Sequence, residues 1–223
     1  MKKYLVKVKS IRHITPDVLQ IVTEKPLQYK FIPGQATEVS INKEDWKEKK
    51  NPFTFTCLPE DNFLEFCIKT YPRHNGVTNE LLKLKKDDEL ILHEVFGAIS
   101  YQGPGVFIAG GAGITPFISI FRSLKSKNEI DNNILVFANK TKADILLEQE
   151  FKELLGDNFI NILSGEKAEG YFYGQISEGF LKPYVNKYTP NVYLCGPPPM
   201  MEAILEQLSS LGVNKAAITV ESI

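Results

Sequence analysis

The sequence predicts a small antiparallel β-barrel followed by a doubly wound α/β domain with a parallel sheet. The first hundred residues hold short β-type runs separated by turn residues, and the remainder alternates compact apolar runs with helical segments. Between the two patterns lies a linker-like stretch, Tyr101-Gln102-Gly103-Pro104-Gly105. A chain of 223 residues suits two small domains. We therefore place one domain at residues 1–100 and the other at residues 101–223.

Six strands are expected in the first domain, because each run is short, rich in β-branched or aromatic residues and bounded by turns such as Thr15-Pro16-Asp17. Short strands in this number are typical of a small barrel. One helical segment is expected at Val77–Leu84, with leucines on its apolar side. The expected strands are Lys3–Arg12, Val18–Thr23, Ala36–Ile41, Phe53–Cys57, Phe63–Lys69 and Glu89–His93.

The second domain is expected to alternate buried parallel strands with helices. The strands are expected at Val106–Ala109, Ile134–Ala138, Phe159–Leu163, Val192–Cys195 and Ala217–Val220. The helices are expected at Pro116–Leu124, Asp144–Leu155 and Pro199–Leu211.

Composition excludes several classes of protein. The formal net charge is -1, so the chain lacks the positive charge with which a generic nucleic-acid binder neutralises phosphates. No apolar run approaches the roughly 18 residues that a membrane span needs, and the start of the chain is typical of a strand and not of a signal peptide. The three cysteines form no CxxC pair, so no metal site is predicted. We expect a cytoplasmic protein that contacts neither nucleic acid nor membrane.

The strongest motif is Gly110-Gly111-Ala112-Gly113-Ile114-Thr115-Pro116, which follows an apolar strand and opens a helix. Glycines let the backbone approach a ligand closely, and the start of a helix offers free amides to a phosphate. Thr115 is expected to be the N-cap and Pro116 the first helical residue. The pattern is GxGxxP, so it satisfies neither the usual dinucleotide fingerprint nor a Walker loop. Taken alone, it also suits a tight structural turn.

A second motif, Cys195-Gly196-Pro197-Pro198-Pro199, again lies between a buried strand and a helix. Ligands of doubly wound sheets bind at the carboxyl ends of the strands, so both motifs point to the same edge. The alternative for Cys195 alone is a buried structural cysteine.

Three weaker motifs lie in the first domain, and each also fits an ordinary strand or turn. They are Asn51-Pro52-Phe53-Thr54, Ile68-Lys69-Thr70-Tyr71, and the helix start Gly76-Val77-Thr78.

Read in order, these motifs, together with Phe31-Ile32-Pro33-Gly34-Gln35, resemble the ferredoxin–NADP reductase superfamily, and most of all its bacterial flavodoxin/ferredoxin reductase-like members. The resemblance covers nearly the whole chain. It implies a flavin-binding barrel followed by a nicotinamide-nucleotide domain, whose two cofactor rings meet in the cleft joining the halves.

The resemblance also implies roles for individual residues. Phe53 would contact the flavin, and Thr54 would hydrogen-bond its reactive nitrogen. Cys195 would lie near the nicotinamide ring, and Glu221 would match a carboxylate near the flavin. Thr54, Cys195 and Glu221 are therefore the candidate catalytic residues. The residues implied in cofactor binding are Asn51, Pro52, Phe53, Thr54, Ile68, Lys69, Thr70, Tyr71, Gly76, Val77, Thr78, Gly111, Gly113, Thr115, Lys140, Ser164, Cys195, Gly196 and Pro197.

The sequence departs from the family at informative positions. Asn51 stands where the family usually has an arginine that pairs with the flavin pyrophosphate, and an amide cannot supply that charged contact. Gly165 follows Ser164 where NADP-dependent members often carry arginine, whereas Lys140 and Lys142 favour NADP. The chain ends Glu221-Ser222-Ile223, without the C-terminal aromatic of plant-type members, so access of the nicotinamide is expected to be less obstructed.

The expected function is therefore transfer of hydride from NADPH or NADH to FAD, and of electrons onward to a ferredoxin or flavodoxin-type carrier. FAD is preferred over FMN because the Gly76-Val77-Thr78 helix start suits a pyrophosphate. The alternatives are the reductase component of an oxygenase and a non-catalytic docking subunit of a larger complex. The sequence leaves the nucleotide preference, the acceptor and the oligomeric state open.

Overall fold

A computed structural model describes residues 2–97 and 99–221 of the chain. Its internal contacts divide the chain into two compact units. Of the described residues, those up to Ser100 and Thr115–Ser123 form the first unit. The second consists of Tyr101–Ile114 and the described residues from Leu124 to Glu221. The short segment Thr115–Ser123 thus packs with the first unit although it follows the linker in sequence.

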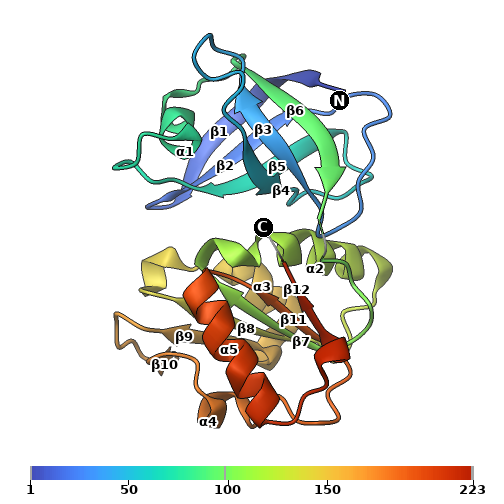
Figure 1. The fold of residues 1–223 in the computed structure, drawn as a ribbon, viewed down its shortest axis with the longest axis vertical. Helices are drawn as coiled ribbons and strands as arrows, with labels where there is room; N and C mark the ends of the chain where they lie inside the picture. The colour runs from blue at the N-terminus through green and yellow to red at the C-terminus, as the bar shows by residue number, and fades with distance from the viewer. Residues whose placement is uncertain (1, 98, 222–223) are drawn as a thin grey trace. The chain divides into compact units, whose positions relative to one another are not determined.

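The first unit is an antiparallel barrel (Figure 1). Its strands are β1 (Tyr4–Thr15), β2 (Val18–Glu24), β3 (Ala36–Ile41), β4 (Asn51–Thr54), β5 (Phe63–Lys69) and β6 (Glu89–Phe96). They pair in the order β4-β3-β6-β1-β2-β5. An antiparallel bridge between Phe55 and Phe66 joins the two ends of this order, just beyond β4. The predicted barrel is confirmed. The fourth strand is Asn51–Thr54 and not Phe53–Cys57, because Asn51 and Pro52 already pair with β3 and pairing beyond Thr54 passes to β5.

The prediction of one continuous helix over Val77–Leu84 is wrong. Helix α1 covers only Val77–Glu80, and a 3-10 turn continues over Leu81–Lys83. Val77, Leu81 and Leu84 are all buried in the barrel core. Burial of these three side chains fixes the segment, and Leu84 already has extended backbone.

The second unit is a six-stranded sheet in which every described pair is parallel. Its strands are β7 (Val106–Gly110), β8 (Ile134–Asn139), β9 (Phe159–Leu163), β10 (Phe172–Tyr173), β11 (Val192–Cys195) and β12 (Ile218–Val220). Their order is β10-β9-β8-β7-β11-β12, so the chain builds outward from β7 to one side and then returns to its other side. The strand order therefore reverses between β7 and β11, and this is the place where doubly wound sheets bind ligands.

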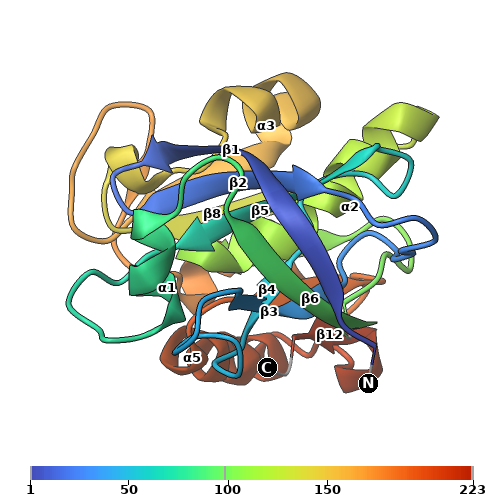
Figure 2. The same ribbon diagram turned by 90° about the horizontal axis from the view of Figure 1, so that it is seen from above.

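The helices of the chain after the linker are α2 (Thr115–Lys127), α3 (Glu148–Leu155), α4 (Glu178–Leu181) and α5 (Pro198–Ser210). Helices α3 and α5 lie on opposite faces of the parallel sheet (Figures 1 and 2), which confirms the doubly wound fold.

Two expectations for this unit were incomplete. The helix expected at Asp144–Leu155 is a 3-10 turn at Lys142–Asp144 followed by α3, because Leu147 between them has a positive φ of 51°. Strand β10 and helix α4 were not predicted, since each is too short to show a periodic pattern.

The linker is fastened to the second unit. The ring of Tyr101 stacks near those of Phe107 and Tyr193. The Tyr193 hydroxyl accepts a hydrogen bond from the Gln102 amide and donates one to the Gly103 carbonyl, both at 2.8 Å. Burial raises the pKa of the Tyr193 hydroxyl, so it stays a donor over the physiological range.

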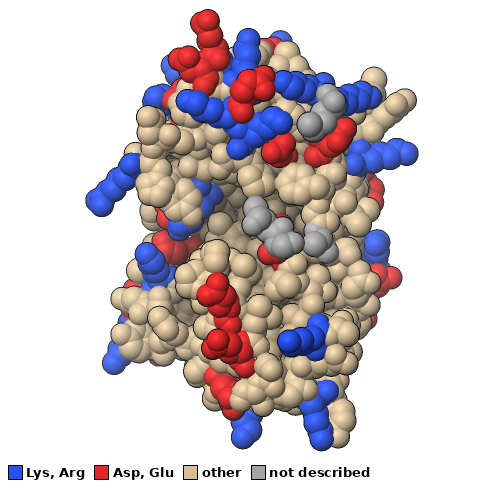
Figure 3. Space-filling view, in the orientation of Figure 1, with Lys and Arg blue, Asp and Glu red and all other residues tan. Residues whose placement is uncertain are grey.

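Charged side chains of both signs are mixed over the face of the barrel shown in Figure 3. Within the described residues, no helix has both the length and the hydrophobicity required for crossing a membrane.

Candidate functional site

The two turns singled out in the second unit pack against each other. They follow β7 and β11, which are neighbours in the sheet. A Cβ atom on Gly113 would collide with the carbonyl of Cys195, and a Cβ on Gly110 would come within 3.0 Å of the Pro197 ring. Gly196 in turn lies so close to Gly110 that its own Cβ would stand 3.2 Å from the Gly110 nitrogen. The glycines are therefore required to close the two turns into one backbone surface at the carboxyl edge of the sheet.

The glycine turn leads directly into α2. Gly111 has a φ of 51°, and a Cβ added there would meet nothing within 4 Å, so its backbone faces open space. A 3-10 turn over Gly111–Ile114 precedes the helix. The expected N-cap is wrong: Thr115 is the first residue of α2, and Ile114 before it already has helical backbone. Because the start of a helix is the positive end of its dipole, this turn is a candidate site for a phosphate group.

Cys195 and Glu221 form a buried pair at the same edge. They follow the paired residues Leu194 and Val220 of β11 and β12, and they are 5% and 6% exposed. The Cys195 thiol donates a hydrogen bond to Oε2 of Glu221 at 2.9 Å. Burial raises the pKa of the Cys195 thiol, and the nearby Glu221 raises it further. Burial also raises the pKa of the Glu221 carboxyl. The structure thus brings together two of the three residues expected to be catalytic, and it keeps the thiol neutral.

The ends of β8 and β9 carry two more of the residues expected to bind a cofactor. Lys140 and Ser164 lie there, and the Gly165 amide donates to the Lys140 carbonyl at 2.8 Å. A carboxylate that the sequence reading missed joins them, because Glu166 accepts a hydrogen bond from the Lys142 amide at 2.8 Å. The ends of β8 and β9 therefore carry a negative charge as well as the positive charges of the two lysines.

Strand β4 carries four of the residues expected to bind the flavin. Its last residue, Thr54, is 7% exposed, whereas Asn51, Pro52 and Phe53 are half-buried. Phe53 also packs on the barrel core. The Asn51 amide can hydrogen-bond a phosphate, but it brings no charge to one.

The end of β5 is largely engaged with the barrel itself. Ile68 is buried in the core. The Lys69 ammonium forms an ion pair with the Asp17 carboxylate, and the Thr70 hydroxyl donates to the Asp17 carbonyl at 3.0 Å. Among these residues, Tyr71 has the most exposed side chain, at 43%. Lys69 and Thr70 therefore shape this strand end more than they offer free groups to a ligand.

The loop before α1 presents an aromatic face and an open helix start. The rings of Tyr71 and His74 stack with centroids 5.5 Å apart. A Cβ on Gly76 would meet nothing within 4 Å, whereas Val77 is buried and Thr78 half-buried. An exposed ring beside open backbone fits a flavin nucleotide, although one helical turn supplies only a weak dipole to its phosphates.

Sequence reasoning missed the residues that hold these segments in place. Asp17 and Glu166 are single carboxylates outside the regular elements, and no sequence spacing identifies them. Arg122 forms a partly buried ion pair with Glu65 at 2.7 Å, and the two residues are 57 positions apart. Only the fold brings such residues together.

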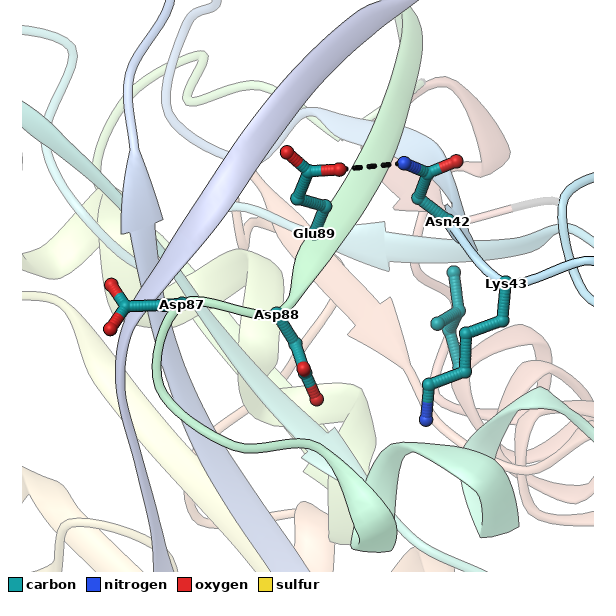
Figure 4. A pocket seen from close by; sticks show the side chains of 6 residues that line it. Asn42, Lys43, Asp87, Asp88 and Glu89 are labelled. Carbon is teal, nitrogen blue, oxygen red and sulfur yellow. Dashed lines mark hydrogen bonds between the residues drawn. The ribbon is translucent and has the colours of Figure 1, made fainter.

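A separate pocket on the barrel contains none of the residues predicted to bind a cofactor (Figure 4). It has a volume of about 230 Å³, and the Asn42 amide donates to the Glu89 carboxylate at 2.7 Å in its wall. Its mixed charges show no preference for a phosphate or a flavin. The residues that line it are Ile41, Asn42, Lys43, Asp87, Asp88 and Glu89.

Comparison with known protein families agrees with the two-part architecture. Residues 3–105 match an FAD-binding domain, and residues 107–206 match an oxidoreductase NAD-binding domain. The chain belongs to the ferredoxin–NADP reductase superfamily. The predicted family and fold class are confirmed, and the FAD-binding match precedes the NAD-binding match along the chain, in the expected order.

Individual relatives span a range of named reductases. The chain is 30% identical to the reductase component of propane 2-monooxygenase from Rhodococcus jostii, over 95% of this chain and 61% of that protein. It is 29% identical to NADH-cytochrome b5 reductase 2 from Mycosarcoma maydis, over 88% of this chain and 62% of that one. The chain thus spans about three fifths of the length of these curated relatives.

A solved structure supports the fold. The ferredoxin NADP+ reductase from Neisseria gonorrhoeae, determined with bound FAD and NADP, superposes with a TM-score of 0.84 at 17% identity, over 99% of this chain and 98% of that one.

Proposed function

We propose that this chain is an NADH-dependent flavoprotein reductase that passes electrons from FAD to a protein acceptor. The main support is the close packing of the Gly110–Gly113 turn against Cys195. This packing forms a backbone surface suited to a phosphate at the point where the strand order reverses. We further propose that residues 1–100 form the FAD domain and residues 101–223 the nucleotide domain.

We propose that different residues bind the two cofactors. The turn at Gly111–Ile114, with Thr115, would hold the nucleotide phosphates. Asn51, Tyr71 and the Gly76–Thr78 segment would hold the flavin nucleotide, and Thr54 would donate a hydrogen bond to its ring. When bound, FAD supplies the conversion of a two-electron hydride into single electrons.

Cys195 and Glu221 would shape the nicotinamide pocket. A neutral thiol bonded to a carboxyl can fill space and orient a ring without attacking it, because the thiolate is the nucleophile. The raised pKa of Cys195 supports this positioning role over covalent catalysis.

NADH is favoured over NADPH by the acid at the β8–β9 edge. Glu166 lies beside Gly165, where no arginine is available to meet a ribose phosphate. A carboxylate repels that phosphate and accepts hydrogen bonds from an unmodified ribose diol.

The acceptor that we propose is a one-electron carrier of the ferredoxin or flavodoxin type. A second candidate is an oxygenase, because the relative from Rhodococcus jostii is named as an oxygenase reductase component. Reduction assays with a ferredoxin, a flavodoxin and cytochrome b5 as alternative acceptors distinguish these possibilities. A non-catalytic docking subunit would reduce none of them.

Anaerobic titration of the purified protein tests the central proposal. We expect a bound flavin, identified as FAD after release, whose visible absorbance is bleached by NADH at lower concentrations than by NADPH. A purified protein that binds no flavin would refute the proposal. In Thr54→Val the flavin should stay bound and its reduction by NADH should slow by about fivefold, since one hydrogen bond contributes about 1 kcal/mol. An unchanged rate would remove Thr54 from the mechanism.

A further inference from the structure

Glu65 lies at the centre of a buried polar network in the barrel unit. This β5 residue is 7% exposed. Its carboxylate accepts hydrogen bonds from the Gln20 amide and the Thr56 hydroxyl, each at 2.8 Å, and from Nη1 of Arg122 at 2.7 Å. A buried carboxylate is tolerated only when it is paired and hydrogen-bonded. Arg122 of α2 is therefore built into the barrel.

Arg122 also holds the backbone next to the proposed flavin contact. The same Nη1 atom donates to the Thr56 carbonyl at 2.8 Å, and the Thr56 amide donates to the Glu65 carbonyl at 2.9 Å. Thr56 follows Thr54 by two residues. Between them, Phe55 is fully buried and stacks on Phe31 with centroids 4.2 Å apart. The segment from Thr54 to Thr56 is thus held by core packing at its centre and by Arg122 at its end.

A second bond from α2 acts on the neighbouring backbone. Ser119 precedes Arg122 by three residues, so it lies on the same face of the helix. The Gly34 amide donates to the Ser119 hydroxyl at 3.0 Å, and the carbonyl of the next residue, Gln35, accepts from the Phe55 amide at 3.0 Å. Helix α2 therefore bonds to Thr56, which follows Phe55 in the chain, and to Gly34, which precedes the residue that pairs with Phe55.

We infer that Arg122 is a positioning residue for the flavin: through the Thr56 carbonyl and Glu65 it holds the Thr54–Thr56 segment so that the Thr54 hydroxyl meets the flavin ring. This inference rests on the proposed function. Arg122 acts through Thr56 and is not itself a catalytic residue. A guanidinium suits the task because its planar group of donors satisfies a carbonyl and a carboxylate together, which a lysine ammonium does less well.

The test compares Arg122→Gln with Arg12→Gln. Arg12 lies at the other end of the same network, where its Nε donates to the Gln20 side chain at 2.6 Å. Within the part of the chain that the structure describes, it bonds to neither Thr56 nor Glu65. Both variants lose a guanidinium, but only the first loses the bonds to Thr56 and Glu65. The readouts are the visible absorbance band of bound FAD without nucleotide, and the rate of flavin reduction at saturating NADH.

In Arg122→Gln, FAD should stay bound, its absorbance band should shift, and reduction should slow by about tenfold while the KM for NADH stays within about twofold. Arg122→Lys should recover part of the rate. Arg12→Gln should match the wild type in both readouts. A wild-type band and rate in Arg122→Gln, with only a lower unfolding temperature, would overturn the inference.

Glu65→Gln keeps the test decisive if Arg122→Gln does not fold. The amide retains the shape of the carboxylate but loses its charge, so the Arg122 guanidinium is held less firmly. We expect a smaller shift of the band and a smaller loss of rate in the same direction, and wild-type values would again overturn the inference. Loss of flavin binding in the wild type itself would instead refute the proposed function, so the two failures are distinguishable.

Discussion

The nucleotide side and the flavin side of this chain are built in different ways. On the nucleotide side, the turns after β7 and β11 fix each other, and the open backbone at Gly111 remains for a ligand. On the flavin side, Lys69 and Thr70 are bound to Asp17, and Asn51 brings no charge. One side is therefore a preformed backbone surface, whereas the other depends on a few half-buried side chains. We expect substitutions to act mainly on folding at the first and mainly on affinity at the second.

The largest effect is expected from Gly113→Ala. The new Cβ would collide with the backbone carbonyl of Cys195, which cannot move without opening the turn. We expect a loss of at least about 2 kcal/mol in the free energy of unfolding, measured with denaturant, and loss of NADH binding. Gly76→Ala is the matched control on the flavin side, because a Cβ there meets nothing within 4 Å and its backbone is extended. Its cost should stay within about 0.5 kcal/mol, and equal costs would refute the contrast.

The same contrast explains what the sequence could predict. Gly110 and Gly113 indicate a close backbone approach, and apolar runs indicate buried strands. The barrel, the parallel sheet and the close-packed glycine turn could therefore be predicted from the sequence. Bonds between distant residues leave no local pattern. The pairing of Asp17 with Lys69, and of Arg122 with Glu65, depends on strand order and could not be predicted.

Helix boundaries were also hard to predict, because core packing and turn geometry override the local helix preference of the sequence. The apolar residues of the segment after Gly76 predict a longer helix than the four-residue α1, because propensity does not reveal how the barrel core draws in Leu81 and Leu84. Thr115 has the chemistry of an N-cap, yet the preceding glycines extend the turn and place it inside the helix.

Asn51→Arg should sharpen the comparison from the flavin side. A guanidinium on β4 would add a charged contact to the flavin pyrophosphate, which the amide cannot make. We expect the Kd for FAD to fall by about tenfold, measured by fluorescence titration of the apoprotein. Asn51→Gln is the control, since it lengthens the side chain without adding charge. A variant that binds FAD no more tightly than the wild type would show that Asn51 does not face the pyrophosphate.

Glu221→Gln should reveal the cost of a buried carboxylate on the nucleotide side. Burial raises the pKa of Glu221 in the folded state, so folding favours its protonated form. The contribution of this raised pKa to the free energy of unfolding is complete below the pKa that Glu221 has in the unfolded chain. It is lost as pH rises through the pKa of Glu221 in the folded state. The neutral amide should therefore raise the unfolding temperature near pH 8, and the difference from the wild type should shrink towards pH 4. A difference that does not vary with pH would contradict this account of Glu221.

The smallest effect is expected at the ribose edge, where the groups are more exposed and salt screens them. Removing the carboxylate in Glu166→Gln should raise kcat/KM for NADPH by about threefold, because the extra phosphate is no longer repelled. The value for NADH should change much less, because the amide oxygen of Gln can still accept a hydrogen bond from the ribose diol. Glu169→Gln is the matched control, since this exposed glutamate lies three residues further along the same loop. The gain should fade as salt is added, which separates electrostatic repulsion from a change in the shape of the turn. If both variants improve NADPH use equally, the general charge of the loop sets the preference, and the specific place of Glu166 beside Gly165 does not.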